Sequence, residues 1–268
     1  MNNEKIIQVK SLTKKYRDFK AVDDISFEVR KGQIFGFLGP NGAGKSTTIK
    51  MLTTLLHPNG GEIMIDGKNP VSQPDAVRKA FGIVFQDPSL DDELTAWENM
   101  EFHGVLYSIP KPLRRQRIEH MLKIVELWER KDELVKRFSG GMKRRLEIAR
   151  GLLHHPKVLF LDEPTLGLDP QTRNNIWNHI IDLNKEEDIT VFFTTHYMEE
   201  AEKVADYICI IDLGKIIAKG SPGELKSKAK ARSLEDAFIK LTGKNIREEE
   251  AKPIDKLRMR RRVFGGRR

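Results

Sequence analysis

The sequence contains a single cysteine, Cys209, among 268 residues, so the chain cannot form an internal disulfide. A lone cysteine suits a reducing compartment, and within the apolar run YICII we expect it to be a small buried residue. No apolar run approaches the roughly 18 residues that span a bilayer, and the amino-terminal MNNEKIIQVK lacks the apolar core of a signal peptide. These absences predict a soluble, cytosolic chain without a disulfide framework.

The body of the chain has little excess charge, although the formal net charge is +8. Residues 255–268 hold one lysine and six arginines against one aspartate, so +6 of the charge lies there and +2 in the rest. This distribution argues against a basic nucleic-acid cleft in the body. We predict a charged, disordered segment over 244–268, which is either simply solvated or in contact with anionic lipid.

The order of the apolar segments predicts an α/β fold. The early third reads as strands at 6–9, 25–29, 33–39, 61–67 and 81–86. The later runs VLFL at 158–161 and VFFTT at 191–195 are apolar throughout, which suits central parallel strands covered on both faces. The segments YICIID and KIIAKG predict an edge hairpin.

Helical spacing dominates the middle block from about 97 to 155. Apolar residues recur at i, i+3, i+4 and i+7 over 118–125 and with a similar spacing over 142–153. The second pattern predicts a helix that begins at Ser-Gly-Gly, residues 139–141, and ends near Pro156. Ser233 and Asp236 predict a capping box at the start of a helix over 233–243.

A phosphate-binding loop is predicted at residues 39–47, GPNGAGKST, which fit G-x-x-x-x-G-K-[ST] between a strand and a helix. Backbone N–H groups would surround the phosphates, Lys45 would reach the β and γ groups, and Ser46 would bind Mg²⁺. The strand–loop–helix context favours this interpretation over an ordinary glycine turn. The residues expected at the nucleotide are Gly39, Pro40, Asn41, Gly42, Ala43, Gly44, Lys45, Ser46 and Thr47.

Two carboxylates follow the apolar strand at 158–161. Asp162 would stand at the carboxyl end of that strand as a Mg²⁺ ligand, and Glu163 is the candidate general base for an attacking water. A guanine site would show N-K-x-D, and NKEED at 184–188 misses it at Glu187. A phosphate loop by itself does not choose among GTPases, kinases and ATPases, so the class of nucleotide enzyme stays open on these motifs alone.

Several further positions occur in one characteristic order. They are Tyr16, which precedes Lys45 by 29 residues, Gln86 at the end of FGIVFQ, Ser-Gly-Gly at 139–141, Asp169 in LGLDP and His196 after VFFTT. Over residues 5–243 the chain resembles the ATP-binding subunits of ABC transporters. Met142 departs from the resemblance, because glutamine is usual at that position.

The resemblance implies a role for each of these positions. Tyr16 would stack on adenine, Gln86 would reach Mg²⁺ and the water, and His196 would contact the γ-phosphate. Ser139, Gly140 and Gly141 would cap the γ-phosphate held by a second subunit, and Asp169 would link the two sites across the dimer. The implied catalytic set is Glu163, His196, Lys45 and Gln86, and the implied metal ligands are Ser46, Gln86 and Asp162.

The resemblance also implies an architecture. It predicts a P-loop NTPase core with a mainly parallel sheet, an antiparallel β subdomain at the amino-terminal side, and a helical subdomain inserted at about 87–155. We expect the nucleotide-binding domain over 1–222, a helical extension over 223–243 and the basic tail over 244–268.

The implied function is a Mg²⁺-dependent ATPase that dimerises around two ATP molecules and powers a membrane permease at the cytoplasmic face. The segments SGGMKRRL, LDEPTLGLDP and SLEDAFIKLTG look most like exporters of the daunorubicin-resistance type. An importer subunit remains an alternative. Another is a soluble ABC-type ATPase acting on nucleic acid or ribosomes, although the chain lacks the second nucleotide domain usual there.

Overall fold

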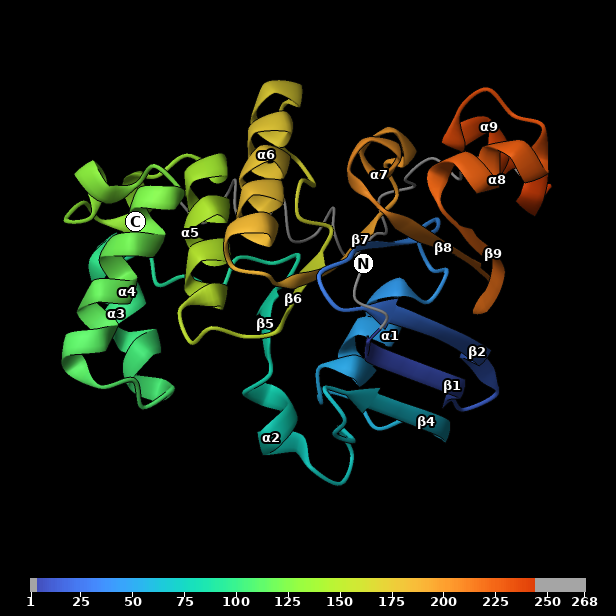
Figure 1. Ribbon diagram of the computed structural model, residues 1–268, viewed down its shortest axis with the longest axis horizontal. Helices are drawn as coiled ribbons and strands as arrows, with labels where there is room; N and C mark the ends of the chain where they lie inside the picture. The colour runs from blue at the N-terminus through green and yellow to red at the C-terminus, as the bar shows by residue number, and fades with distance from the viewer. Residues whose placement is uncertain (1–3, 244–268) are drawn as a thin grey trace, which may run out of the picture.

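Two sheets form the body of the protein in the computed structural model, which describes residues 4–243 (Figure 1). The six-stranded sheet has the order β5-β6-β7-β3-β8-β9, in which the first five strands are parallel and β9 is antiparallel. The antiparallel sheet has the order β2-β1-β4. This arrangement confirms the predicted α/β fold class. The strands are β1 Lys5–Tyr16, β2 Phe19–Arg30, β3 Ile34–Leu38, β4 Gly60–Ile65, β5 Phe81–Val84, β6 Val158–Asp162, β7 Thr190–Thr195, β8 Tyr207–Asp212 and β9 Lys215–Gly220.

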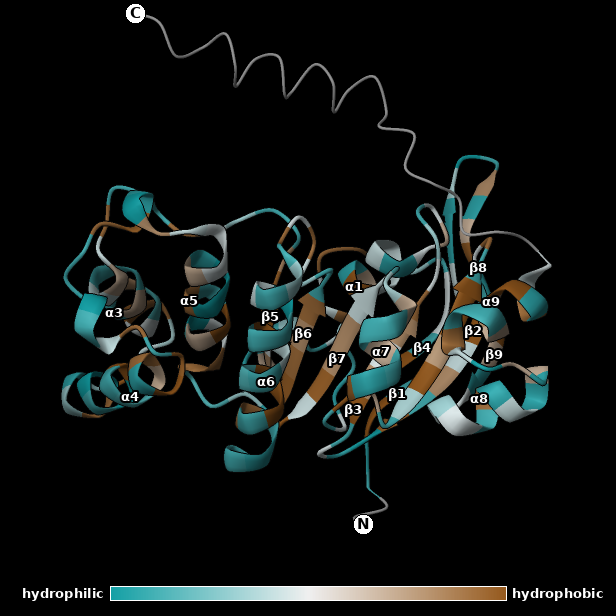
Figure 2. Cartoon of the chain, turned by 90° about the horizontal axis from the view of Figure 1, so that it is seen from above, coloured by the Kyte–Doolittle hydropathy of each residue, from teal (hydrophilic) through white to brown (hydrophobic). Residues whose placement is uncertain are grey.

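The parallel strands are buried on both faces, as their continuous apolar runs predict. In β3, Phe35 and Phe37 face the antiparallel sheet, whereas Ile34 and Leu38 face the opposite layer of helices. Successive side chains of a strand point to opposite faces, so β3 contributes side chains to two separate hydrophobic cores. Figure 2 shows hydrophobic colouring along β6 and β8 and mixed colouring on the helices.

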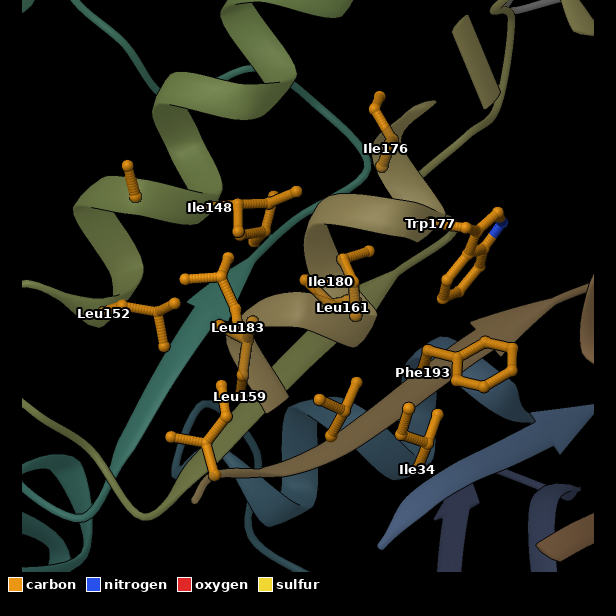
Figure 3. Close-up of a cluster of buried hydrophobic side chains, with 14 of the residues drawn as sticks. Ile34, Ile148, Leu152, Leu159, Leu161, Ile176, Trp177, Ile180, Leu183 and Phe193 are labelled. Carbon is orange, nitrogen blue, oxygen red and sulfur yellow. The ribbon is translucent and has the colours of Figure 1, made fainter. Parts of the chain in front are cut away.

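Helices cover the face of the six-stranded sheet that does not contact the antiparallel sheet. Figure 3 shows Ile148 and Leu152 of α5 and Ile180 and Leu183 of α6 packed around Leu159 and Leu161 of β6. Helices α3 and α4 pack on the side of α5 that faces away from the sheet (Figure 1). The helices are α1 Lys45–Leu52, α2 Pro74–Arg78, α3 Ala96–Leu106, α4 Lys111–Ile124, α5 Gly140–Leu152, α6 Pro170–Glu186, α7 Met198–Val204, α8 Pro222–Ala229 and α9 Leu234–Thr242.

The observed boundaries differ from the predicted ones in several places. Strands β1 and β2 each extend over 12 residues, because their pairing continues beyond the apolar segments. Strand β5 ends at Val84, two residues before Gln86, and α5 ends at Leu152, short of Pro156. These shifts leave the order of the elements unchanged.

The predicted capping box at Ser233 is only half right. Ser233 Oγ accepts a hydrogen bond from the Asp236 N–H at 3.1 Å, but the Asp236 carboxylate accepts from the Arg232 N–H. Helix α8 forms the reciprocal pair with Ser221 and Glu224. The box needs the longer Glu or Gln side chain to reach back to the cap, and Asp236 is one methylene shorter.

Cys209 lies in β8 and is fully buried, as expected for a small core residue. Burial raises the pKa of its thiol, which keeps it protonated. None of the helices within residues 4–243 is long and apolar enough to cross a membrane. The predicted basic tail over 244–268 lies outside the described residues.

Candidate functional site

The phosphate-binding loop joins β3 to α1 and places Lys45 at the first position of the helix. The Lys45 side chain is 5% exposed and donates hydrogen bonds to the Gly39 carbonyl at 2.7 Å and the Pro40 carbonyl at 3.3 Å. The ammonium group is therefore folded back across the loop. A buried cation beside a helix amino-terminus is a strong site for phosphate.

Two glycines of this loop are required by close approach of other backbone segments. A Cβ on Gly39 would lie 2.2 Å from the Ile211 carbonyl oxygen, and one on Gly44 would lie 2.5 Å from the Ala21 carbonyl oxygen. Gly44 also has φ +109, a conformation that L side chains rarely adopt. Strands β2 and β8 thus pack directly against the loop and fix its shape.

Asp162 ends β6 beside the loop, as the sequence predicts. Its Oδ1 lies 3.4 Å from Ser46 Oγ and accepts a 2.6 Å hydrogen bond from Thr194 Oγ1. Two oxygen ligands at right angles on Mg²⁺ stand about 3.0 Å apart, given metal–oxygen distances of about 2.1 Å. Ser46 and Asp162 therefore offer the oxygen chemistry of the predicted magnesium site, and their separation is about 0.4 Å longer than this ideal spacing.

Glu163 lies at the centre of the site and is 6% exposed. Its Oε1 is 3.1 Å from Lys45 Nζ, and its Oε2 is 2.8 Å from His196 Nδ1. Burial raises the pKa of this carboxyl, but the hydrogen bond with His196 and the charge of Lys45 outweigh burial and lower it below its ordinary value. The Glu163 side chain is therefore ionised and directed into the site.

The backbone at Glu163 is unusual, with φ +50 in a residue other than glycine. Its N–H is shared between the Thr194 carbonyl at 3.2 Å and Thr194 Oγ1 at 3.1 Å. Thr194 thus contacts both carboxylate residues, through the side chain of Asp162 and the N–H of Glu163. The sequence does not indicate this role, because Thr194 lies in the apolar run VFFTT and is predicted only as a strand residue.

The structure does not bring every predicted residue into this cluster. Gln86 is exposed, and within residues 4–243 its side chain forms no hydrogen bond. Tyr16, at the end of β1, is 45% exposed and stands opposite Phe19 of β2. Both remain predictions: Gln86 as a ligand of Mg²⁺ and Tyr16 as the adenine platform.

Residues 139–141 open α5, as predicted, with Ser139 as the N-cap. Ser139 and Gly140 are exposed, and none of the hydrogen bonds or ion pairs found within residues 4–243 joins this segment to the loop at 39–47. A Cβ on Gly141 would lie 2.5 Å from the Thr172 side chain. The second glycine therefore also permits close packing of α5 against α6.

Met142 has a defined environment in place of the usual glutamine. Its side chain packs against the apolar core, and its sulfur lies 3.3 Å from an Arg130 guanidinium nitrogen. The thioether therefore supports the start of α5 from inside the chain. Asp169, predicted to act across a dimer, caps α6 by accepting bonds from the Thr172 N–H at 3.0 Å and Oγ1 at 2.6 Å.

Arg144 is a second residue that the sequence does not single out. In the run KRR it resembles part of a solvated basic surface, but in α5 it is 7% exposed. Its guanidinium donates to the carbonyls of Asp162, Glu163 and Pro164. No local pattern reveals this contact, because 18 to 20 residues of chain separate the donor from its acceptors.

Comparisons with known proteins agree with this site. Residues 22–166 match the ABC transporter family. The chain is 44% identical over 221 residues to the daunorubicin/doxorubicin resistance ATP-binding protein DrrA of Streptomyces peucetius, covering 82% of this chain and 67% of that one. It is 42% identical over 220 residues to the Nod factor export ATP-binding protein I of Ralstonia nicotianae, with coverage of 82% and 68%.

Solved structures show the same fold. The cbiO1 protein of Clostridium perfringens, part of the ABC transporter complex cbiONQ, superposes with a TM-score of 0.79 at 32% identity, over 84% of this chain and 92% of that one. A dimeric, post-hydrolysis ATP-binding cassette bound to ADP and Pi superposes with a TM-score of 0.71 at 28% identity, over 80% and 98%. The chain belongs to the ABC transporter family as an ATP-binding subunit, and its enzymatic activity is ATP hydrolysis.

Proposed function

We propose that this chain hydrolyses ATP at a site completed by a second nucleotide-binding subunit and drives an exporter of drugs or other hydrophobic compounds. The observation that supports it most strongly is that the buried Glu163 carboxylate lies 3.1 Å from Lys45 Nζ and 2.8 Å from His196 Nδ1. Relatives named for drug resistance and for export support the direction of transport. The cargo contacts would lie in the permease.

Each residue of the cluster has a distinct task in this proposal. Lys45 and the backbone N–H groups of 39–47 bind the β- and γ-phosphates, while Ser46 and Asp162 would hold Mg²⁺, which when bound would neutralise phosphate charge. The ionised Glu163 accepts a proton from the attacking water. His196 orients the Glu163 carboxylate through the 2.8 Å contact and would contact the γ-phosphate of bound ATP.

The segment 139–141 would act on the nucleotide of the partner subunit. It opens a 13-residue helix at the surface, where the N–H groups and the helix dipole favour an anion. The described residues give it no link to the phosphate loop of its own chain. A solved neighbour that is dimeric supports pairing of two such subunits. In this proposal Asp169 would lie near the contact.

The helical group α3–α5 would receive the permease. Phe102, Val105 and Leu106 of α3 are 62%, 53% and 64% exposed, and Leu113 of α4 is 39% exposed. A cluster of exposed apolar side chains of this kind is typical of an interaction surface. Binding at this face would place the subunit at the cytoplasmic side of the membrane, where the basic tail over 244–268 can meet anionic lipid headgroups.

A mixing experiment tests the shared site. Lys45→Ala and Ser139→Arg subunits are each defective at both sites of their homodimers, whereas a mixed dimer contains one intact site. We expect the mixture to recover ATPase activity above either variant alone. Lys45→Ala mixed with the double variant Lys45→Ala/Ser139→Arg is the matched control, because no pairing restores a site. If mixed dimers are shown to form but recover no ATPase activity, the proposal that two subunits share each ATP site is refuted.

A further inference from the structure

We propose that Arg144 is a positioning residue that holds the catalytic carboxylate of Glu163 and links its orientation to the segment 85–89. This inference rests on the proposed function, in which Glu163 is the base. Arg144 contacts neither substrate nor metal in this role. It acts through the backbone that carries Glu163.

The contacts of Arg144 use the whole guanidinium group. Nε donates to the Pro164 carbonyl at 2.7 Å, and Nη2 donates to the carbonyls of Asp162 at 3.2 Å and Glu163 at 3.1 Å. Nη1 donates to the Phe85 carbonyl at 2.6 Å and to Glu147 Oε2 at 3.1 Å. An arginine has five N–H donors in a fixed plane, so these five contacts leave none free.

Three of the acceptors are consecutive carbonyls around Glu163, where the backbone has its left-handed conformation. A residue other than glycine keeps such a conformation only when its surroundings hold it there. Thr194 holds the N–H of Glu163 from the β7 side, and Arg144 holds its carbonyl from the α5 side. Together they fix the peptide groups on both sides of the Glu163 side chain.

The same guanidinium is connected to the segment that follows β5. Glu147, which is 3% exposed, balances its charge and accepts hydrogen bonds from the Ser89 N–H at 2.7 Å and Ser89 Oγ at 3.2 Å. Arg150, one turn further along α5, donates to the Ser89 carbonyl at 2.8 Å. Together with the bond from Arg144 to the Phe85 carbonyl, these contacts hold the backbone on both sides of Gln86.

This network gives a physical route between two surfaces of the subunit. The segment 85–89 leads from β5 toward the helices α3 and α4, and α5 begins at the segment 139–141. If the segment 85–89 or helix α5 moves relative to β6, the hydrogen bonds of Arg144 must break or rearrange. Because those bonds hold Glu163, such a displacement changes the position of the base as well.

Two substitutions of Arg144 test this proposal, and a substitution of the neighbouring Arg145 is the control. Arg144→Met removes every donor but keeps much of the volume, and Arg144→Lys keeps a cation beside Glu147 without the planar fork. Arg145→Met is the matched control, since Arg145 adjoins Arg144 on α5 but bonds to the Val125 carbonyl and Glu126. If the Arg144→Met protein does not fold, the Arg144→Lys protein alone still tests the proposal.

We expect both Arg144 variants to lower kcat by about 10- to 100-fold, the cost of a misplaced catalytic group, with ATP affinity within about threefold of the parent. Arg145→Met should retain the parent kcat. Full activity of a folded Arg144→Lys would overturn the proposal, because charge pairing with Glu147 would then suffice. A loss of ATP affinity that accounts for the whole defect would overturn it too.

A double-mutant cycle separates positioning from general damage. Single-turnover hydrolysis is measured for Glu163→Gln and for Arg144→Lys/Glu163→Gln. If Arg144 acts through Glu163, the two rates agree within about twofold, because the base is already absent. Independent losses that multiply would refute the Arg144 proposal alone. Parent-level hydrolysis by Glu163→Gln would instead refute the base assignment in the proposed function.

Discussion

Lys45 Nζ lies 3.1 Å from Glu163 Oε1, and the two side chains are only 5% and 6% exposed. The phosphate-binding lysine and the candidate base thus form a buried ion pair. Removing one member of such a pair leaves an uncompensated charge, which usually costs several kcal/mol. Loss of one partner should therefore destabilise the folded state.

The first prediction concerns the stability of this pair without nucleotide. Lys45→Met should lower the free energy of unfolding by about 3 kcal/mol, because it leaves Glu163 with His196 as its remaining partner. The double variant Lys45→Met/Glu163→Gln should recover much of that loss. Urea denaturation of the three proteins measures the coupling, and additive effects of the two substitutions would contradict it.

The second prediction concerns turnover. Glu163→Gln keeps the shape of the side chain but cannot accept the proton from water, so hydrolysis should fall by about 100-fold or more. ATP binding should persist, and an ATP-dependent dimer should accumulate on size-exclusion chromatography. Glu199→Gln is the control, since Glu199 is an exposed glutamate on α7. A Glu163→Gln protein that stays monomeric with bound ATP would argue against the dimer.

The third prediction concerns the permease. Phe102→Asp and Leu106→Asp place a charge on the exposed apolar surface of α3, so co-purification with the permease from membranes should be lost. The ATPase activity of the isolated subunit should be unchanged, because neither residue lies near Glu163. Val71→Asp changes a side chain that is 45% exposed elsewhere and should co-purify normally. If all three variants co-purify equally with the permease, the permease must contact another face of the subunit.

The fourth prediction concerns acid sensitivity. Burial, followed by the charges of Arg150 and His154, lowers the pKa of His103 from 6.5 to about 3. The unfolded chain then binds a proton below pH 6.5 that the folded chain does not, so stability is full above pH 6.5 and falls as the pH drops toward 3. The slope from this residue reaches about 1.4 kcal/mol per pH unit.

His103→Phe tests this assignment. The Nε2 atom of His103 is buried and finds no hydrogen-bond partner among residues 4–243, so the substitution removes a group that contributes no bond there. Stability at pH 7.5 should be unchanged or higher, and its decline between pH 6.5 and 5 should become shallower. Denaturation curves at several pH values measure both effects. An unchanged pH slope would show that another group controls the decline.

Much of the fold follows from local patterns in the sequence. Continuous apolar runs identified the parallel strands, and helical spacing identified α4 and α5, because each pattern reflects which faces of an element are buried. The loop 39–47 and the carboxylates Asp162 and Glu163 were found for the same reason, since a strand end and a helix start fix their place. The boundaries were less accurate, because pairing and capping continue past the apolar residues.

Local residue patterns therefore predict the class of fold, the order of its elements and the residues that meet at the phosphate loop. How Glu163 is held, with Thr194 on one side and Arg144 on the other, is visible only once the chain is folded. The physical reason is distance along the chain: Thr194 and Arg144 stand 31 and 19 residues from Glu163. Their contacts arise from packing of β7 and α5 against β6, and no local periodicity encodes them.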